Sequence, residues 1–403
     1  MMKTTDYLVG SMAPQVGVRV KRARNLNVEV LRLVAIVGIA VFHTFQPWFN
    51  TVAYGIDSGV TATGLESSAW ALFFLGVINL LGATGNHIFF MISGYFLLPH
   101  MAEESTHRRY WRAQYLSVAR KLGAIAVSVA FYAALALAID AWFVDIPGVS
   151  LTHFGWLVGG LEFVWVYAAL LLGAPVAGWL QKHLPGWPAL LVVLFLAVTA
   201  ANLYVAFFNQ GSVTRSLFEW RKLLSAVTYL VGFLLAGFVA QYWDHFRRVG
   251  LSLLVGGIFL VVVPVGALAA GRDAELIGAM SFKSTSLLSL LLALGALIAT
   301  MMHTGVEVLP ADRGRWERVV RAGAAGILGF YIMQSVFGSL VNTWIHSLLD
   351  PVLRLWGSET SVSGGGVFLF LVTGCVVSCV LGVAMVGFDW LTRRPLLRSV
   401  RLQ

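Results

Sequence analysis

Stretches of about 20 apolar residues recur from one end of the chain to the other, and this repetition limits the possible folds more than any other feature. A run of that length can cross a bilayer as an α-helix. The sequence therefore predicts an all-α, polytopic (multi-pass) integral membrane protein with about ten transmembrane helices. The ten candidate spans are 28–48, 77–98, 120–142, 154–175, 188–208, 224–243, 250–270, 284–302, 322–342 and 366–391.

The composition excludes a soluble globular protein. Charged residues make up 12% of the 403 residues and hydrophobic residues make up 58%. Soluble domains carry about 25% charged residues, roughly twice as many. The first apolar run, 28–48, has spanning length and no nearby small-residue cleavage site, so we expect it to remain in the mature protein.

The distribution of Lys and Arg predicts how the chain is oriented. With the N-terminus in the cytoplasm, 21 of the 28 basic residues fall in cytoplasmic segments and 6 fall in outer loops. This bias follows the positive-inside rule and predicts that both termini are cytoplasmic, in the plasma or inner membrane of the cell. It also accounts for the net charge of +9, so we expect the lipid bilayer, and no nucleic acid, as a partner.

The sequence predicts one membrane domain flanked by short tails. Residues 1–26 are predicted to be a disordered basic cytoplasmic tail, 27–392 the transmembrane domain and 393–403 a second basic cytoplasmic tail. The apolar segment 69–98 is too long for one span. Its glycines are predicted to break it, with Asn86 beside them, so that 69–81 forms a partial or interfacial helix.

Two features argue against a disulfide framework and a metal centre. The only cysteines, Cys375 and Cys379, are four residues apart in one span, where they share a helix face. No zinc-binding, Walker or dinucleotide motif occurs in a suitable context. We therefore predict that the cysteines are packing residues and that no metal is bound.

Four ionisable side chains stand out inside predicted spans, where each costs about 2.5–3.5 kcal/mol on insertion scales. Arg32 and His43 are eleven residues apart, which places them on one helix face about 16 Å apart along the axis. Their function is open: Arg32 is suited to hold a phosphate or to pair with Glu29, and His43 to transfer protons or to hydrogen-bond a neighbouring helix.

The other two ionisable residues, His87 and Glu162, are predicted to lie within a turn or two of the membrane midplane, as is His43. A buried carboxylate usually has an imidazole or a cation beside it. We therefore hypothesise that Glu162 hydrogen-bonds and tunes His43, with His87 as a second helper, while a structural ion pair of Glu162 with another cation remains the alternative.

Two runs of residues resemble a known family. The run from Asn25 to His43, with ten residues between Arg32 and His43, resembles the opening helix of the membrane-bound acyltransferase 3 family. The second run, 85–96, resembles the paired aromatics before Ser-Gly-Tyr in that family's second helix. Weaker similarities follow at 163–175 and 329–333, so the resemblance covers most of the chain.

The resemblance implies an O-acyltransferase, most often an O-acetyltransferase, that modifies a cell-envelope or lipid-linked glycan. Acetyl-CoA or another acyl-CoA would be the cytoplasmic co-substrate, with no permanently bound cofactor, and homo-oligomer formation is compatible with this function. His43 would act as general base or acyl carrier. Our hypothesis from the buried charges, and not the resemblance, adds Glu162 as its catalytic partner. The residues assigned to acyl-CoA binding are Arg32, Ser93, Arg109, Arg112 and Arg120.

The chain departs from the family pattern at three positions. Glu162 stands where relatives tend to have an aromatic residue, Gln334 where many have His, and His87 is an addition. We assign His87, Tyr167 and Gln334 as acceptor-site or helper residues, and the acceptor and acyl group stay open.

Two other functions fit ten spans with buried charges. One is a transporter or flippase for a lipid-linked sugar, and the other is a subunit of a polysaccharide export complex. The spacing of Arg32 and His43 favours the enzyme. If Arg32 binds a CoA phosphate, the pantetheine arm of CoA is long enough to reach His43, and a transporter does not need an imidazole at that distance.

Overall fold

The computed structural model describes most of the chain. The described residues are 25–62, 64–208, 220–281, 283–302, 313–356 and 362–400. Apart from its last two residues, the predicted N-terminal tail lies outside these ranges.

The prediction of an all-α polytopic membrane protein is confirmed. Within the described ranges, eight helices are long and apolar enough to cross a membrane. They are α1 (Leu26–Tyr54), α2 (Ala69–Glu104), α3 (Tyr110–Trp142), α5 (Glu162–His183), α6 (Trp187–Phe207), α7 (Trp220–Gln241), α9 (Gly250–Ala270) and α15 (Gly364–Leu391).

The two remaining predicted spans take other forms. The span predicted at 284–302 is the short apolar helix α11 (Leu287–Met302). The span predicted over 322–342 is not one straight helix, because α12 (Arg313–Ala325) and α13 (Ile327–Val336) meet at Gly326 with a bend of 44°. The shorter or more polar elements are α4 (Gly155–Gly160), α8 (Trp243–Phe246), α10 (Ala274–Met280), η1 (Lys283–Thr285), α14 (Gly338–Trp356) and α16 (Arg393–Ser399).

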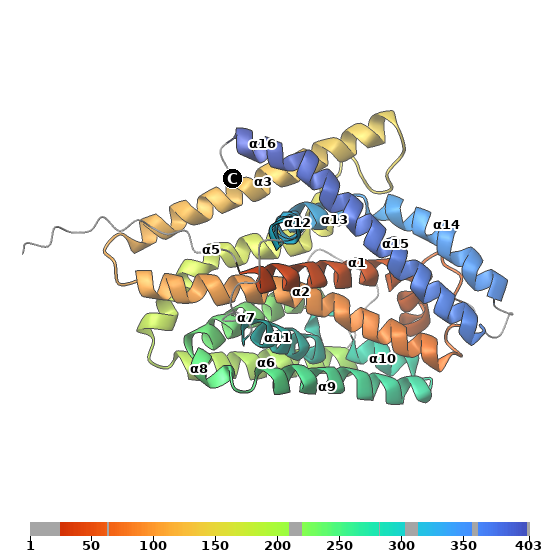
Figure 1. Ribbon diagram of the computed structural model, residues 1–403, viewed down its shortest axis with the longest axis horizontal. Helices are drawn as coiled ribbons and strands as arrows, with labels where there is room; N and C mark the ends of the chain where they lie inside the picture. The colour runs from red at the N-terminus through yellow and green to blue at the C-terminus, as the bar shows by residue number, and fades with distance from the viewer. Residues whose placement is uncertain are drawn as a thin grey trace, which may run out of the picture.

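Helices α1 and α2 run lengthwise through the middle of the molecule, with α9 along one edge and α3 and α16 along the opposite edge, and α15 runs obliquely from α16 down one side (Figure 1). Helix α2 packs against α1, α5, α7, α9 and α11. Most of its spanning window is buried, whereas α6 and α9 are mainly exposed and present apolar side chains to the surroundings. The centre of the fold is therefore the α1–α2 pair.

The predicted break in α2 is wrong, because the helix is continuous over 36 residues. The glycines allow close packing instead. A Cβ at Gly82 would overlap the Phe42 ring of α1, and one at Gly85 would lie 2.7 Å from the Ala35 carbonyl oxygen. Tertiary packing at these positions outweighs the weak helix propensity of glycine.

Local sequence determines where α1 begins and ends. The side chain of Asn25 caps the first turn by accepting a hydrogen bond from the Asn27 amide at 3.0 Å. The helix ends at Gly55, which adopts the left-handed conformation with φ of 61° and donates its amide to the Asn50 carbonyl. The 29 residues between these caps carry both Arg32 and His43.

An ionic cluster joins the end of α15 to α16 and α3. Asp389 is fully buried and accepts hydrogen bonds from Tyr132 at 2.8 Å and from Arg393 at 2.9 Å. Arg393 is 3% exposed and also donates to Ser128 at 3.1 Å. The tail predicted at 393–403 therefore needs correction: Arg393–Ser399 form a helix whose first residues are buried in the membrane domain.

Candidate active site

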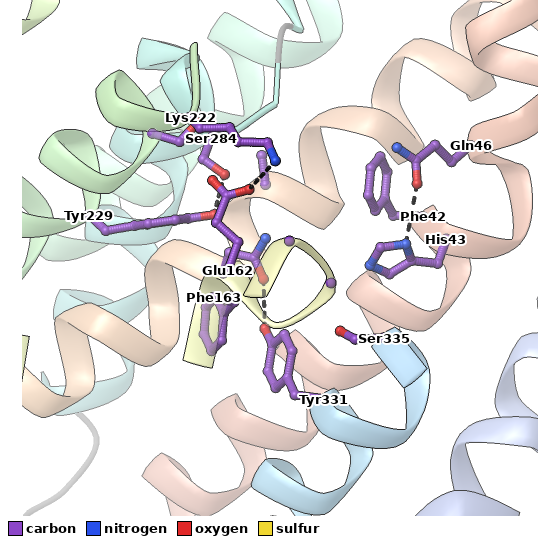
Figure 2. Close-up of a pocket in the computed structure, with 15 residues that line it drawn as sticks. Phe42, His43, Gln46, Glu162, Phe163, Lys222, Tyr229, Ser284, Tyr331 and Ser335 are labelled. Carbon is purple, nitrogen blue, oxygen red and sulfur yellow. Dashed lines mark hydrogen bonds and ion pairs between the residues drawn. The ribbon is translucent and has the colours of Figure 1, made fainter. Parts of the chain in front are cut away.

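A polar cavity of about 270 Å³ opens between α1, α2, α4, α5, α7, η1 and α13 (Figure 2). It brings together side chains that are more than 280 residues apart in the sequence, and its walls mix charged, hydroxyl and aromatic groups. The lining residues are Phe42, His43, Gln46, Ala83, Asn86, Gly159, Gly160, Glu162, Phe163, Lys222, Ser225, Tyr229, Ser284, Tyr331 and Ser335.

His43 projects from α1 into one side of this cavity (Figure 2). Its Nδ1 lies 3.2 Å from the side-chain oxygen of Gln46, one turn further along the helix, and the Phe42 ring lies 4.9 Å from the imidazole. Because an amide oxygen can only accept, Nδ1 carries the proton and Nε2 keeps its lone pair. The imidazole is thus oriented with an unprotonated nitrogen available to a hydroxyl group.

Glu162 lines the opposite side of the cavity, where its Oε2 lies 3.9 Å from the Nζ of Lys222 (Figure 2). The predicted hydrogen bond between Glu162 and His43 is wrong, because each of these side chains has a different partner. The apolar run before Glu162 ends as the short helix α4, so Glu162 begins α5.

Hydroxyl and aromatic groups complete the cavity walls. The Tyr331 hydroxyl donates to the Asn86 side-chain oxygen at 2.6 Å. The rings of Tyr331 and Phe163 are stacked, with centroids 4.1 Å apart and planes 6° apart. Tyr229 forms a hydrogen bond with the Ser284 hydroxyl. These contacts hold the walls in place around the space between His43 and Glu162.

His87 lies behind this wall, outside the cavity lining. Its imidazole is fully buried, its Nε2 lies 2.9 Å from the Ser284 carbonyl oxygen, and its ring centroid is 5.2 Å from that of Tyr229. Because a carbonyl oxygen can only accept, Nε2 is the protonated nitrogen. The structure thus places His87 where it supports Tyr229 and Ser284.

Arg32 also lies outside the cavity lining, and it forms an ion pair with Glu29. Its Nη1 is 3.1 and 3.0 Å from the two carboxylate oxygens, and the side chains of Arg32 and Glu29 are 28% and 3% exposed. The ion pair of Arg32 with Glu29, which was the alternative to phosphate binding by Arg32, is therefore present. Since α1 is continuous, Arg32 and His43 are about 16 Å apart along its axis.

Residues 25–387 match the family model described as an acyltransferase domain, that of the acyltransferase 3 family. The chain belongs to the acyltransferase 3 family. It is therefore a membrane acyltransferase, and the predicted family is confirmed. Comparisons with curated proteins and with solved structures gave no match.

In this acyltransferase, one residue assigned to acyl-CoA binding lies beside one assigned to the acceptor site. The Ser93 hydroxyl of α2 lies 3.4 Å from the Tyr167 hydroxyl of α5. Ser93 is seven residues beyond Asn86 on α2, about 10 Å along the helix and outside the cavity lining. Gln334 is half-buried on α13, between the lining residues Tyr331 and Ser335.

The three loop-proximal arginines lie apart from the cavity. Arg109 directly precedes α3, and Arg112 and Arg120 follow on that helix, all with exposed side chains. No cluster of three or more His, Cys, Asp or Glu residues that could hold a metal occurs within the described ranges of this acyltransferase.

Sequence reasoning missed several residues of the cavity. Gln46 follows His43 at helical spacing, which is the one local signal that could have revealed it. Lys222 stands at the start of α7 and resembles a solvated loop charge. Tyr229 and Ser284 are polar residues next to apolar runs, and only the fold brings them to His43. The missed lining residues with polar side chains are Gln46, Asn86, Lys222, Ser225, Tyr229, Ser284, Tyr331 and Ser335.

Proposed function

We propose that this acyltransferase moves an acyl group, and specifically acetyl, from cytoplasmic acyl-CoA to a hydroxyl group of a cell-envelope or lipid-linked glycan. The observation that supports this most is His43, whose free Nε2 faces a polar cavity while Gln46 holds Nδ1. A positioned imidazole of this kind is suited to take a proton from a hydroxyl group.

The proposed reaction is a direct transfer. Nε2 of His43 takes the proton of the acceptor hydroxyl, and the oxygen attacks the thioester carbonyl of acyl-CoA. The carbon–sulfur bond then breaks, a new ester bond forms, and the proton on His43 passes to the departing thiolate. An acyl-histidine intermediate is the second route, in which Nε2 itself attacks the thioester first.

The orientation proposed from the distribution of Lys and Arg lets acyl-CoA and the glycan approach His43 from different sides of the membrane. It places the start of α1, with Arg32, on the cytoplasmic side, where a guanidinium suits a CoA phosphate. The exposed Arg109, Arg112 and Arg120 would attract the polyanionic CoA on that side. Glu162 and Lys222, in the first turns of α5 and α7, line the cavity with His43, and the glycan would approach His43 from their side.

The test is acetyl transfer by the purified full-length protein in lipid nanodiscs, with radiolabelled acetyl-CoA and fractionated envelope glycans. Label should enter a glycan fraction, and His43→Ala should abolish this. His183→Ala is the matched control, because His183 is exposed at the end of α5. Gln46→Leu should lower kcat, because the imidazole loses the partner that orients it.

Three outcomes would overturn parts of the proposal. Full transfer by His43→Ala would refute the mechanism. Label retained on the protein after removal of acetyl-CoA would favour the acyl-histidine route. An absence of label in every glycan fraction, together with movement of a lipid-linked sugar across the membrane of vesicles that contain the reconstituted protein, would support the transporter instead.

A further inference from the structure

The ion pair of Glu162 and Lys222 has unused hydrogen-bonding capacity. The single contact at 3.9 Å is the only ion pair or hydrogen bond of either side chain within the described residues. An ammonium group has three donors, and a carboxylate has about four acceptor positions. Both side chains line the cavity and are partly exposed, at 39% and 24%, so most of this capacity can reach a ligand.

The ion pair of Glu162 and Lys222 lies where an acceptor bound at His43 would extend. Glu162 and Lys222 lie across the cavity from His43 and Gln46 (Figure 2). A ligand whose hydroxyl group contacts Nε2 of His43 would extend toward them, past the hydroxyl groups on the cavity walls. The two charges therefore face the part of the acceptor next to the reacting hydroxyl.

The charges of the pair restrict what can bind there. A sugar hydroxyl can accept from Lys222 and donate to Glu162, and two neighbouring hydroxyls can do both at once. A uronate or phosphate group would pair with Lys222 and leave the Glu162 carboxylate opposed by a like charge. An ammonium group on the sugar would do the reverse. Such a like-charge contact disfavours the binding of a charged ligand.

We propose that Glu162 and Lys222 form an acceptor subsite that binds neighbouring hydroxyl groups of an uncharged sugar and excludes charged sugars. The inference rests on the proposed function, and it assigns Glu162 to acceptor positioning rather than to contact with His43. Because the pair joins α5 to α7, a purely structural role is the competing explanation.

The experiment measures acceptor preference, which a structural ion pair would not change. The probes are methyl pyranosides in three forms at millimolar concentration: uncharged hexosides, the matching methyl uronides and the matching methyl 2-amino-2-deoxyhexosides. Each is tested as an acceptor of radiolabelled acetyl from acetyl-CoA and as a competitor of the glycan fraction that the unmodified protein labels. Lys182→Met is the matched control, since Lys182 is exposed near the end of α5.

We expect the unmodified protein to prefer uncharged hexosides to both charged forms. Glu162→Gln should lower kcat/KM for uncharged acceptors about 10- to 100-fold, as expected for lost hydrogen bonds to a charged group. It should also shift preference toward uronides, because Lys222 is then unpaired. Lys222→Met should shift preference toward amino sugars, and neither variant should change the acetyl-CoA KM.

The outcomes separate failure of this inference from failure of the proposed function. If the unmodified protein labels a glycan in a His43-dependent manner, but the two variants lose activity on all acceptors equally and unfold at lower temperature, the pair is structural and the subsite is refuted. Unchanged preference in stable variants refutes it as well. If the unmodified protein labels no acceptor, the proposed function itself fails.

Discussion

Asp389 gives the largest expected loss of stability for one substitution. Its carboxylate is fully buried and accepts from Tyr132 and from Arg393, which is itself 3% exposed. Asp389→Ala would leave the guanidinium buried without its counter-ion. Removing one partner of a buried pair costs about 3–5 kcal/mol, whereas replacing both by apolar residues is often neutral. We therefore expect Asp389→Ala to lower the free energy of unfolding by about 3–5 kcal/mol, and addition of Arg393→Met to restore part of it.

The assay is equilibrium unfolding in mixed micelles of the unmodified protein, the two single variants and the double variant. The coupling energy of the Asp389–Arg393 pair follows from the four values. Asp389→Asn is the conservative control, because it keeps the shape and an acceptor for Tyr132 while losing the charge. If Asp389→Ala unfolds like the unmodified protein, or if the double variant is the sum of the singles, the pair does not stabilise the fold as we argue.

Three further substitutions test the helix packing, the donor end and the cavity wall. Gly94→Ala should lower the free energy of unfolding by about 1–3 kcal/mol, because the new Cβ would overlap a backbone carbonyl of α7. Gly173→Ala is the control and should have no such effect, because the space around Gly173 is open. Equal effects of the two substitutions in the unfolding assay would contradict this prediction. Arg32→Ala should raise the acetyl-CoA KM more than it lowers kcat. It is combined with Glu29→Gln so that no buried carboxylate is left without its partner. Normal acetyl-CoA affinity with lost turnover would assign Arg32 another role. Tyr331→Phe should cost about 1 kcal/mol of stability and slow acetyl transfer; an unchanged rate would exclude its hydroxyl from the site.

The helices could be predicted from sequence because apolar length is a local property. What failed was the interpretation of glycine. Gly82 and Gly85 weaken a helix when only propensity is considered, but the partners that require them, Phe42 and Ala35, belong to another helix. The bend at Gly326 was missed for a related reason, since the apolar run continues through it while the helix axis changes.

The candidate site could be predicted in part, because a charge inside an apolar run is visible locally. His43 and Glu162 were recognised in this way, and the fold brings both to one cavity. Lys222 and Asp389 were missed, because each lies near the end of an apolar run beside other polar residues and resembles a solvated charge. Their burial and pairing depend on helices that are distant in the sequence, which a single sequence does not reveal.

The length of α2 links the site to the thickness of the membrane. Its 36 residues extend about 54 Å, while the hydrocarbon core of a bilayer is about 30 Å thick. The helix must therefore tilt or extend beyond the lipid, and its last turns carry the polar residues His100, Glu103 and Glu104. Hydrophobic mismatch acts on such a helix by changing its tilt. Because α2 contributes Asn86 to the cavity and packs on α1, α5 and α7, a change in its tilt would move one wall of the site.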